Sequence, residues 1–533
     1  MSNPLRNLAY RPLRRVEDWY GYAFGQDQNP FTYLGAITIY LFWIILVSGL
    51  YLFIFFEMNV TGAYHSVEWL THEQWYLGGV MRSLHRYASD AAVVAILLHV
   101  AREFLRNRYR GPRWYSWFTG VPLLWMLTLL GITGYWLVWD ELAQYIAIGS
   151  AELLDAIPIF TDPMARNFLT NEALSDRFFT LMAFLHLLGI PIFLILGIWF
   201  HVLRVVNPKI NPPRSVMAGT LIALLALSLV KPAVSHEFAD LGMVPTRLNL
   251  DWFYLAIYPV MDLTSPQFVW GLLAVGTVLL AALPWLPPEK KQPAAEVHLS
   301  QCSGCTFCAL DCPYGAITLV DHISEDKKRS HKEAVVDPSM CVSCGICTGS
   351  CPQATPFRKH DPLATAIDLP QFSLRHLYAT VEDNLSKAEE RPRIVVYGCD
   401  HGVAVETLDM PGVATVSLPC TGLLPPSTIE YNLREERADG VFITGCCSGD
   451  CQYRTGNTLV EERIEGKREP RLRARVDRSR IRVRWASVNE ARTLRSEIQA
   501  FANDLKASSV GGPSDDAQSK QATGRQAAGG DHV

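Results

Sequence analysis

Four histidines lie in apolar stretches of the chain and form two pairs by spacing. His85 and His99 are 14 residues apart, and His186 and His201 are 15 apart. Fourteen residues are close to four turns of an α-helix, so the histidines of a pair share one face, about 21 Å apart along the axis. Two such helices side by side would present two histidine–histidine clamps within a bilayer core of about 30 Å. Two imidazoles fill both axial positions of a haem iron, so the spacing predicts two b-type haems that carry electrons across a membrane.

The alternative is four unrelated histidines, each hydrogen-bonded within a helix bundle. It is disfavoured for all four together, because ionisable side chains in membrane spans are costly and by default functional. Glycines repeat the 14-residue interval, with Gly35 and Gly49 on the first apolar run and Gly120 and Gly134 on the third. We expect these glycines to let a flat macrocycle approach the helix backbone, although small residues also serve ordinary helix packing.

The long apolar runs of this 533-residue chain almost all precede residue 288. Such runs, in a sequence with 49% hydrophobic residues, predict a protein partly embedded in a membrane. The first 30 residues have no signal-peptide core, and we expect them to form a cytoplasmic segment. We predict an all-α transmembrane bundle of about six spans: Thr32–Phe56, His85–Val100, Tyr115–Val138, Phe178–Val202, Val216–Val230 and Phe268–Leu286.

Lysine and arginine are unevenly distributed over the predicted loops. The N-terminal segment and the loops after the second, fourth and sixth spans are basic, whereas Glu57–Tyr76 contains neither residue. The positive-inside rule therefore predicts that the N-terminus and everything after residue 288 are cytoplasmic. The second and fourth spans then run in the same direction. We expect His85 to pair with His186 near the outer face and His99 with His201 near the inner face.

Three segments carry a resemblance to a known family. GVMRSLHRY around His85, WFTGVPLL from Trp117 and GITGYWLVWDELAQ from Gly131 resemble the N-terminal half of cytochrome b of the bc1/b6f class. The resemblance covers residues 31–213 and implies a four-helix di-haem domain in which Arg82 meets a haem propionate. Tyr33 stands where the b6 protein has the cysteine of an extra covalent haem, so no third haem is expected.

Residues 214–287 resemble the start of subunit IV, with two of its spans. The sequence LDWF, which includes Asp251, stands where that family has Pro-Glu-Trp-Tyr at its quinol-oxidation site. By this resemblance the Asp251 carboxylate would take a proton from quinol, which makes it the candidate catalytic residue. The alternative is a solvated loop acid that caps a helix. The chain has no Rieske motif, which would supply the family's usual electron acceptor.

All thirteen cysteines follow a linker at 288–297 that is rich in Pro, Lys and Ala. Eight of them form two runs of the pattern Cys-x2-Cys-x2-Cys-x3-Cys-Pro within residues 298–365. This is the run of bacterial two-cluster ferredoxins, in which the fourth cysteine ligates the other cluster. Zinc is the alternative, disfavoured because both matched runs end in Cys-Pro. We predict an α+β ferredoxin-like domain with two [4Fe–4S] clusters, one held by Cys302, Cys305, Cys308 and Cys351 and the other by Cys341, Cys344, Cys347 and Cys312.

The remaining five cysteines lie in the last part of the chain. Three short β-branched runs, Arg393–Tyr397, Val413–Leu418 and Gly440–Thr444, each end just before a cysteine. Strand ends that present cysteines between helices predict a small α/β domain with these thiols along one edge. Vicinal thiols in a cytoplasmic domain favour cluster ligands or redox groups over structural disulfides.

YGCDHG, LPCTG and ITGCCSGDCQYRTGN, with the later RVRWASVNEA, resemble the delta subunit of methyl-viologen-reducing hydrogenase over residues 391–502. That family carries a [2Fe–2S] cluster and exchanges electrons with a heterodisulfide-reductase-like flavoprotein. Gly402 replaces one family cysteine and Cys447 is additional, so which four cysteines ligate stays open. A metal-free α/β interaction domain is the alternative, and residues 503–533 are expected to be disordered. Matched by position, the implied ligands are Cys399, Cys420, Cys446 and Cys451.

Together these features predict a membrane protein that exchanges electrons between the quinone pool and cytoplasmic iron–sulfur clusters through two b haems. We expect a quinone or quinol oxidoreductase subunit of a respiratory-type chain, active within a complex in the cytoplasmic (inner) membrane of a bacterium or archaeon. The resemblances imply a heterodisulfide-reductase-like flavoprotein or other soluble low-potential carrier as partner, and a homodimer as in the cytochrome b family. The alternative is a passive anchor and relay subunit without its own quinone site. A net charge of −4 gives no case for nucleic acid.

Overall fold

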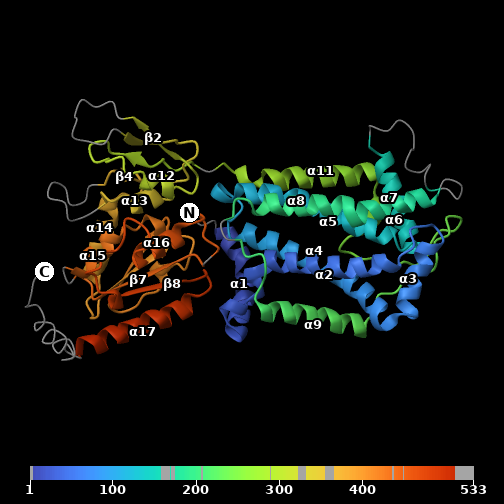
Figure 1. Cartoon of the computed structure of the whole chain (residues 1–533), viewed down its shortest axis with the longest axis horizontal. Helices are drawn as coiled ribbons and strands as arrows, with labels where there is room; N and C mark the ends of the chain where they lie inside the picture. The colour runs from blue at the N-terminus through green and yellow to red at the C-terminus, as the bar shows by residue number, and fades with distance from the viewer. Residues whose placement is uncertain are drawn as a thin grey trace, which may run out of the picture. The chain divides into compact units, whose positions relative to one another are not determined.

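Two compact units make up the chain in the computed structural model. The structure describes residues 4–157, 169, 174–205, 208–288, 290–321, 332–354, 365–434, 437–447 and 449–510. The first unit, Met1–Glu289, is helical, and the second, Lys290–Val533, mixes helices with strands (Figure 1). The helical N-terminal part and the mixed α/β part expected from the sequence are both present.

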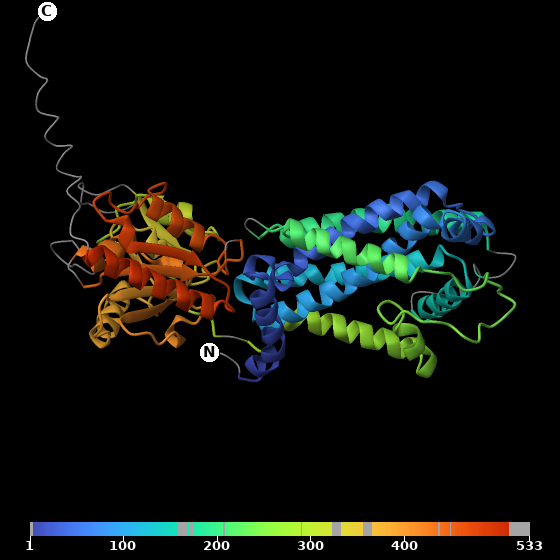
Figure 2. The same ribbon diagram turned by 90° about the horizontal axis from the view of Figure 1, so that it is seen from below.

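Long helices that run alongside one another form the first unit (Figures 1 and 2). α2 packs along α4 and α5 along α8, while α9 lies against α4 and α11 against α5. α1 lies across one end of this bundle (Figure 1). The described helices of the unit are α1 (Pro4–Phe24), α2 (Leu34–Phe55), α3 (Gly62–His72), α4 (Val80–Leu105), α5 (Trp114–Trp136), α6 (Glu141–Asp155), α7 (Asp176–Phe184), α8 (Ile190–Val202), α9 (Arg214–Val230), α10 (Ile257–Leu263) and α11 (Pro266–Ala282).

Within the described residues, four helical segments are long and apolar enough to cross a membrane. They coincide with four of the six predicted spans: Pro30–Phe55, Gly111–Trp136, Phe179–Val202 and Pro266–Trp285. α9 is apolar but shorter, with 17 residues, and α4 has 26 residues but carries charged side chains. A helix of that length extends about 39 Å, so α4 is long enough to cross. That α4 and α9 are also spans stays a prediction.

Charged residues of α4 have partners inside the protein. Arg86 Nε lies 3.2 Å from the Asp90 carboxylate, and the buried Arg102 lies 2.6 Å from Glu17 of α1. Such pairing reduces the cost of a charge in apolar surroundings. Burial disfavours the ionised form of Glu17, but the charge and hydrogen bond of Arg102, with a hydrogen bond from Tyr10 and the charge of Arg106, together hold the pKa of Glu17 below its ordinary value. This ion pair ties α1 to the end of α4.

Short antiparallel strand pairs and short helices form the first part of the second unit. β1 pairs with β4, and β2 pairs with β3. β1 falls in the segment expected to be a linker, because its partner β4 is distant in sequence and leaves no local signal. The elements are β1 (Glu296–Val297), α12 (Phe307–Asp311), β2 (Ile317–Asp321), β3 (Lys332–Val336), α13 (Ile346–Gly349) and β4 (Ile367–Asp368).

A parallel sheet in the strand order β6–β5–β7–β8 forms the second part, and the three runs expected to be strands form β5, β6 and β7. The carboxyl ends of parallel strands lie at the same edge of a sheet, which brings Cys399, Cys420 and Cys446 together. Figure 2 shows this sheet in orange and red among its helices. The elements are α14 (Leu374–Lys387), β5 (Ile394–Cys399), β6 (Val413–Leu418), α15 (Pro426–Arg434), β7 (Gly440–Gly445), α16 (Gly456–Glu465), β8 (Ile481–Trp485) and α17 (Ala491–Val510).

α17 continues past residue 503, where the sequence analysis expected disorder to begin. Phe501 is fully buried in a cluster with β5 and β7 residues, and Leu505 packs against the same cluster. These apolar contacts keep the helix ordered to Val510. The rest of the expected tail lies outside the described residues.

The two parts of the second unit share one hydrophobic core and a buried ion-pair network. The core combines residues such as Ile317 and Leu369 with Val395 and Ile443 of the parallel sheet. The Arg463 guanidinium on α16 donates to Asp311 at 2.6 Å, to Ser350 at 2.6 Å and to the Gly422 carbonyl at 3.1 Å.

Asp311 is also bound by a second arginine. Arg468 Nε donates to its other oxygen at 2.8 Å. Burial disfavours the carboxylate, but the hydrogen bonds from Arg468, Ser350 and Arg463 hold the pKa of Asp311 below its ordinary value. The end of α12, in the first part of the unit, is therefore bound to α16 of the second part by the ion pair between Asp311 and Arg463.

Replacing Arg463 should weaken the second unit. Arg463→Met leaves the Asp311 carboxylate buried with one arginine partner fewer, at a cost of about 3 kcal/mol, which corresponds to a fall of about 6–12 °C in the thermal midpoint of a unit of this size. The midpoint is measured by the loss of iron–sulfur absorbance on heating. Lys387→Met breaks an exposed pair with Asp383 and is the matched control. A control shift as large as that of Arg463→Met would show that the buried network is not the cause.

Candidate redox centres

Two histidine pairs lie between helices of the first unit. The ring centroids of His85 on α4 and His186 before α8 are 6.3 Å apart, and those of His99 and His201 are 6.5 Å apart. A metal ion held by two imidazole nitrogens at about 2.0 Å each puts the ring centroids roughly 6 Å apart. Both pairs therefore fit an iron between the rings, with the partners expected from the sequence. That the four histidines ligate haem stays a prediction.

The second pair has one residue more between its histidines than the first. The structure resolves this difference with a π-helical turn, Leu185–Gly189, which contains His186 and leads into α8. A π-turn takes up one residue more than an α-turn, and such turns are frequent at functional sites. His186 and His201 consequently face the same side of their helix, as His85 and His99 do.

Backbone carbonyls orient the imidazoles. His85 Nδ1 lies 2.9 Å from the Ile45 carbonyl, and His186 and His201 make the corresponding bonds to the carbonyls of Leu130 and Ser116. Each carbonyl belongs to the residue four positions before one of the repeated glycines. An Nδ1–H that donates to a carbonyl leaves Nε2 as the nitrogen available to a metal, which is how partners behind a histidine fix its tautomer.

Hydroxyl groups lie beside the same nitrogens. Ser48 Oγ is 3.2 Å from His85 Nδ1, Thr133 Oγ1 is 3.2 Å from His186 Nδ1, and Thr119 Oγ1 is 3.4 Å from that of His201. Each hydroxyl residue directly precedes one of the repeated glycines.

The repeated glycines contact the imidazole rings. A Cβ at Gly49 would lie 2.9 Å from His85 Cε1, and one at Gly134 would lie 2.9 Å from His186 Cε1. The corresponding distances are 3.2 Å for Gly120 with His201 and 3.6 Å for Gly35 with His99. The sequence analysis expected these glycines to make room for a macrocycle. In the structure their direct neighbour is the histidine ring, and a side chain at Gly49 or Gly134 would push the ring off its carbonyl partner. That the glycines also make room for a macrocycle stays a prediction.

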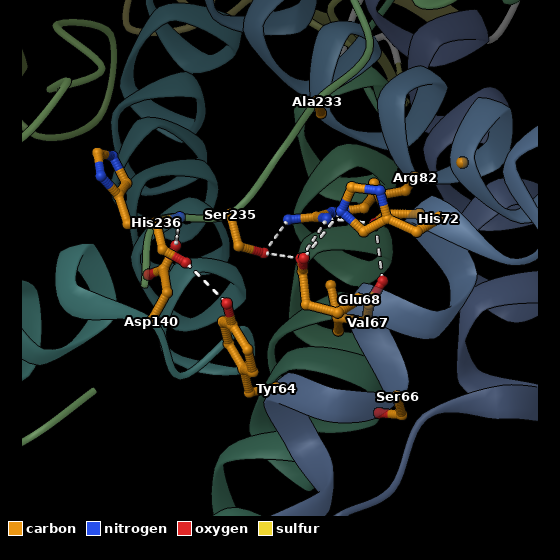
Figure 3. A network of polar contacts seen from close by, with 12 residues as sticks. Tyr64, Ser66, Val67, Glu68, His72, Arg82, Asp140, Ala233, Ser235 and His236 are labelled. Atoms are coloured by element: carbon orange, nitrogen blue, oxygen red, sulfur yellow. Dashed lines mark hydrogen bonds and ion pairs between the residues drawn. The ribbon is translucent and has the colours of Figure 1, made fainter. Parts of the chain in front are cut away.

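Arg82, expected to meet a haem propionate, has protein partners in this structure. Its guanidinium contacts Thr71, Ser235 at 2.7 Å and Glu68 at 3.3 Å (Figure 3). Glu68 also accepts from Ser235 at 2.6 Å and lies 3.0 Å from His72. The propionate role stays a prediction. The sequence analysis missed Glu68, whose one signal is that it is an acid in a segment, Glu57–Tyr76, without lysine or arginine.

Polar contacts around Arg82 and Asp140 also join the segment after α9 to the helices that precede it in the chain. Asp140 caps α6 by accepting from Ala143 N at 2.9 Å. It also accepts from His236 N at 2.9 Å (Figure 3). Tyr64 donates to the His236 carbonyl at 3.1 Å. Residues 233–239 are thereby held across α3, α4 and α6.

Asp251 is buried, so the alternative of a solvated loop acid is wrong. Its side chain is 3% exposed. Tyr135 donates to Asp251 Oδ2 at 2.6 Å, and Arg86 Nη2 lies 3.3 Å from the same oxygen. Asp251 Oδ1 accepts from Phe253 N at 2.8 Å within a turn, and α10 begins only at Ile257 with Ala256 as its cap, so Asp251 does not cap a helix. Arg86 also pairs with Asp90, so two acids share one guanidinium. The sequence analysis overlooked the signal for this pair, which is an arginine and an aspartate one helical turn apart within a predicted span.

An apolar cavity of about 710 Å³ lies among α5, α6, α10 and α11. Ile132 and Trp136 line it from the helix that carries Tyr135, and Ile257 and Tyr258 line it from the segment that follows Asp251. Its volume is within the range of ligand-binding pockets, about 300–1,000 Å³, and its mostly apolar wall suits a hydrophobic ligand.

The eight cysteines of the ferredoxin-like runs surround two cavities in the crossed arrangement expected from the motif. Cys302, Cys305, Cys308 and Cys351 line one, and Cys312, Cys341, Cys344 and Cys347 line the other. In the described part of the chain no three metal-ligating side chains converge on a single-ion position, and four thiols around a cavity suit a larger group. Burial raises the pKa of the thiols of Cys308 and Cys344 to about 12, so a thiolate there needs the positive charge of bound metal.

The five remaining cysteines separate into four buried thiols and one outside them. Cys399, Cys446 and Cys451 form a buried cluster in which Sγ of Cys399 and Cys446 are 3.9 Å apart, and the fully buried Cys420 interacts with Cys451. Hydrogen bonds from Cys420 and Cys446 lower the pKa of Cys451, so the set can hold a thiolate. Cys447 is half-buried and its Sγ lies 3.7 Å from a Glu490 carboxylate oxygen. The geometry fits the four cysteines implied by the hydrogenase resemblance.

Comparison with known proteins matches three parts of the chain. Residues 24–207 match the family of cytochrome b/b6/petB, residues 301–355 a 4Fe-4S dicluster domain, and residues 395–508 the delta subunit of methyl-viologen-reducing hydrogenase. Cytochrome b6 of Prochlorococcus marinus (strain MIT 9515) is 30% identical over 185 residues, which are 35% of this chain and 84% of that protein. Cytochrome b6 of Prochlorothrix hollandica is 29% identical over 35% of this chain and 83% of its own length. A chain of a solved "Hyperthermophilic respiratory Complex III" covers 48% of this chain and 75% of its own length, at 19% identity and a TM-score of 0.40.

Fold and sites together define a membrane electron-transfer protein with haem and iron–sulfur centres. The chain belongs to the cytochrome b/b6 family, and it joins this part to a dicluster domain and to a hydrogenase delta-subunit-like region. The resemblances to cytochrome b, to two-cluster ferredoxins and to the hydrogenase delta subunit are confirmed, whereas that of residues 214–287 to subunit IV stays a prediction.

The glycine contacts predict an asymmetry between two single-residue changes. Gly49→Ala should displace the His85 ring and lower the content of one haem or shift its absorption band, because overpacking of this kind costs about 1–3 kcal/mol. Gly35→Ala meets His99 at an ordinary contact distance and should keep both haems. Haem content is measured by the pyridine haemochrome assay, and bands by low-temperature spectra. Equal effects of the two variants would contradict the contact argument.

Iron content tests the choice among the five cysteines. Two [4Fe–4S] clusters and one [2Fe–2S] cluster contain ten non-haem irons (4 + 4 + 2). Cys420→Ser should reduce the content to about eight, whereas Cys447→Ser should keep ten, because its thiol lies outside the buried set. A loss of two irons in Cys447→Ser would show that Cys447 is a ligand.

Proposed function

We propose that this chain links the membrane quinone pool, through two b haems, to cytoplasmic iron–sulfur clusters and a soluble low-potential partner. It would act as a quinone or quinol oxidoreductase subunit that is active within a complex. The observation that carries the quinone assignment is the buried Asp251 carboxylate, bound by Tyr135 and Arg86. The apolar cavity that Trp136 and Ile257 help to line supports it.

Asp251 would serve as the proton acceptor for quinol. Arg86 Nη2 lies 3.3 Å from the carboxylate, and the Tyr135 hydroxyl orients it through a donated hydrogen bond. A carboxylate within reach of a substrate hydroxyl can act as a general base, and the apolar cavity supplies a place for a hydrophobic ring. Proton uptake at this position fits the expected outer-face location of the LDWF segment.

The histidine pairs would hold the two haems that carry electrons between the membrane faces. Haem supplies the one-electron chemistry, and the protein supplies ligand geometry and surroundings. The carbonyl-bound Nδ1 atoms and the glycine contacts hold the rings in place. We place the His85–His186 pair near the outer face and the His99–His201 pair near the inner face, from the distribution of basic loops.

The iron–sulfur region would connect this path to a soluble protein. The eight cysteines around the two cavities would hold two [4Fe–4S] clusters, and Cys399, Cys420, Cys446 and Cys451 would hold a [2Fe–2S] cluster. The match to the hydrogenase delta subunit supports a heterodisulfide-reductase-like flavoprotein as the partner. The N-terminus and this region would lie in the cytoplasm, and the cytochrome-like part would form a homodimer.

Asp251→Asn tests the quinone assignment. An amide keeps the size and hydrogen-bonding capacity of the carboxylate but cannot take a proton, so haem reduction by a quinol analogue should slow about 100- to 10,000-fold. The rate is measured by stopped-flow absorbance, with both haem spectra unchanged. Asp262→Asn is the matched control, because this exposed acid also accepts a hydrogen bond from a tyrosine, Tyr145.

A fall of less than about threefold in Asp251→Asn would contradict the assignment, since loss of a general base has a far larger effect. A purified chain that equilibrates its haems with its clusters but does not oxidise quinol at all would instead be a passive anchor and relay subunit.

A further inference from the structure

The two cysteine runs of the ferredoxin-like part have equivalent sequences but unequal surroundings. Counted from the first cysteine of each run, Leu310 of α12 corresponds to Gly349 of α13. Leu310 is 71% exposed, whereas every residue of α13 is buried. The two runs are therefore equivalent in sequence but not in contacts. Another part of the chain covers α13 and leaves Leu310 of α12 accessible.

The segment that follows Cys420 covers α13. A Cβ at Gly349 would overlap the Gly422 carbonyl oxygen, and one at Gly345 would overlap the Leu423 side chain. At both positions this chain has glycine, which lets the two backbones approach. The α13 half, which carries Cys344 and Cys347, thus packs directly on the three-residue turn Thr421–Leu423.

Hydrogen bonds hold this contact in place. Arg463 donates to the Gly422 carbonyl on one side and to Ser350, directly after α13, on the other. Its side chain is 1% exposed. A buried arginine with partners on both segments fixes their separation, because each partner loses a charged donor if the segments move apart.

Cysteines of two different sets meet at this contact. Cys344 and Cys420 belong to one buried cluster with Ile346 and Leu459, and Tyr453 packs against it. Cys344 lines the cavity with Cys312, Cys341 and Cys347, and Cys420 belongs to the buried set with Cys399, Cys446 and Cys451. The other cavity, lined by Cys302, Cys305, Cys308 and Cys351, contributes no cysteine to this cluster.

We propose that the contact between α13 and Thr421–Leu423, called here the α13 junction, is the electron-transfer junction of the second unit. One electron passes directly between the centre held by the Cys420 set and the centre held by the Cys344 set. In either direction one centre is oxidised by one electron and the other is reduced by one, and no bond or proton moves. The centre held by the Cys302 set is next in line, on the side where Leu310 of α12 is exposed. This order rests on the [2Fe–2S] cluster of the proposed function. It adds which of the two other clusters exchanges electrons with that cluster.

Magnetic interaction between neighbouring centres tests the order. In the reduced full-length protein, the electron paramagnetic resonance signal of the [2Fe–2S] cluster should saturate at several-fold lower microwave power in Cys341→Ala, because its fast-relaxing neighbour is lost. Cys302→Ala, at the equivalent first position of the other run, should leave the saturation of that signal unchanged. The opposite pattern, or equal effects of the two variants, would overturn the proposed order.

A second pair of variants keeps all ligands. Gly349→Val should separate α13 from Gly422 and slow electron exchange between the [2Fe–2S] cluster and its neighbour several-fold in freeze-quench experiments, with all ten irons retained. Leu310→Val, at the exposed equivalent position, should leave the rate unchanged. An unchanged rate in Gly349→Val would overturn the junction.

The two proposals fail in distinguishable ways. If the unaltered protein has eight irons and no [2Fe–2S] signal, the third cluster of the proposed function is absent and the junction falls with it. If the signal is present but its saturation changes in Cys302→Ala and not in Cys341→Ala, the third cluster stands and only the order is wrong.

Discussion

The rings of His85 and His186 rest on neighbouring helices, each bonded to a backbone carbonyl, at positions where a side chain would not fit. These positions are Gly49 for His85 and Gly134 for His186, with almost no space to spare. The contact sets how closely α2 approaches α4 and α5 approaches α8, the two most intimately packed helix pairs of the bundle. The gap between the facing imidazoles depends on these separations.

Much of this protein is readable from its sequence because its chemistry is carried by residues at fixed local intervals. The histidine spacing and the Cys-x2-Cys-x2-Cys-x3-Cys runs specify which side chains face one another within a single helix or loop. The short β-branched runs before Cys399, Cys420 and Cys446 likewise identify strands whose ends meet at one sheet edge.

What the sequence does not show is which distant groups become partners. Glu68 and Ser235 as partners of Arg82, and Arg463 as the partner of Asp311, depend on contacts between segments far apart in the chain. The glycines were recognised by their interval, but their contact with the imidazole rings could not be, because it depends on how two helices pack. Burial of Asp251 was hidden for the same reason: an acid in a loop becomes an internal acid only when α4 and α5 supply Arg86 and Tyr135.

The π-helical turn at Leu185–Gly189 shows how the bundle tolerates a change in length. An added residue in an ordinary helix rotates everything beyond it by about 100°, which would turn one histidine away from its partner. Here the local widening confines that rotation to a single turn, and the helix beyond it continues in phase. A ligand pair in a bundle of this type is therefore specified by facing direction, not by residue count. Intervals of 14 and 15 are then equivalent ways of building the same clamp, and insertion of one residue near a ligand need not abolish it.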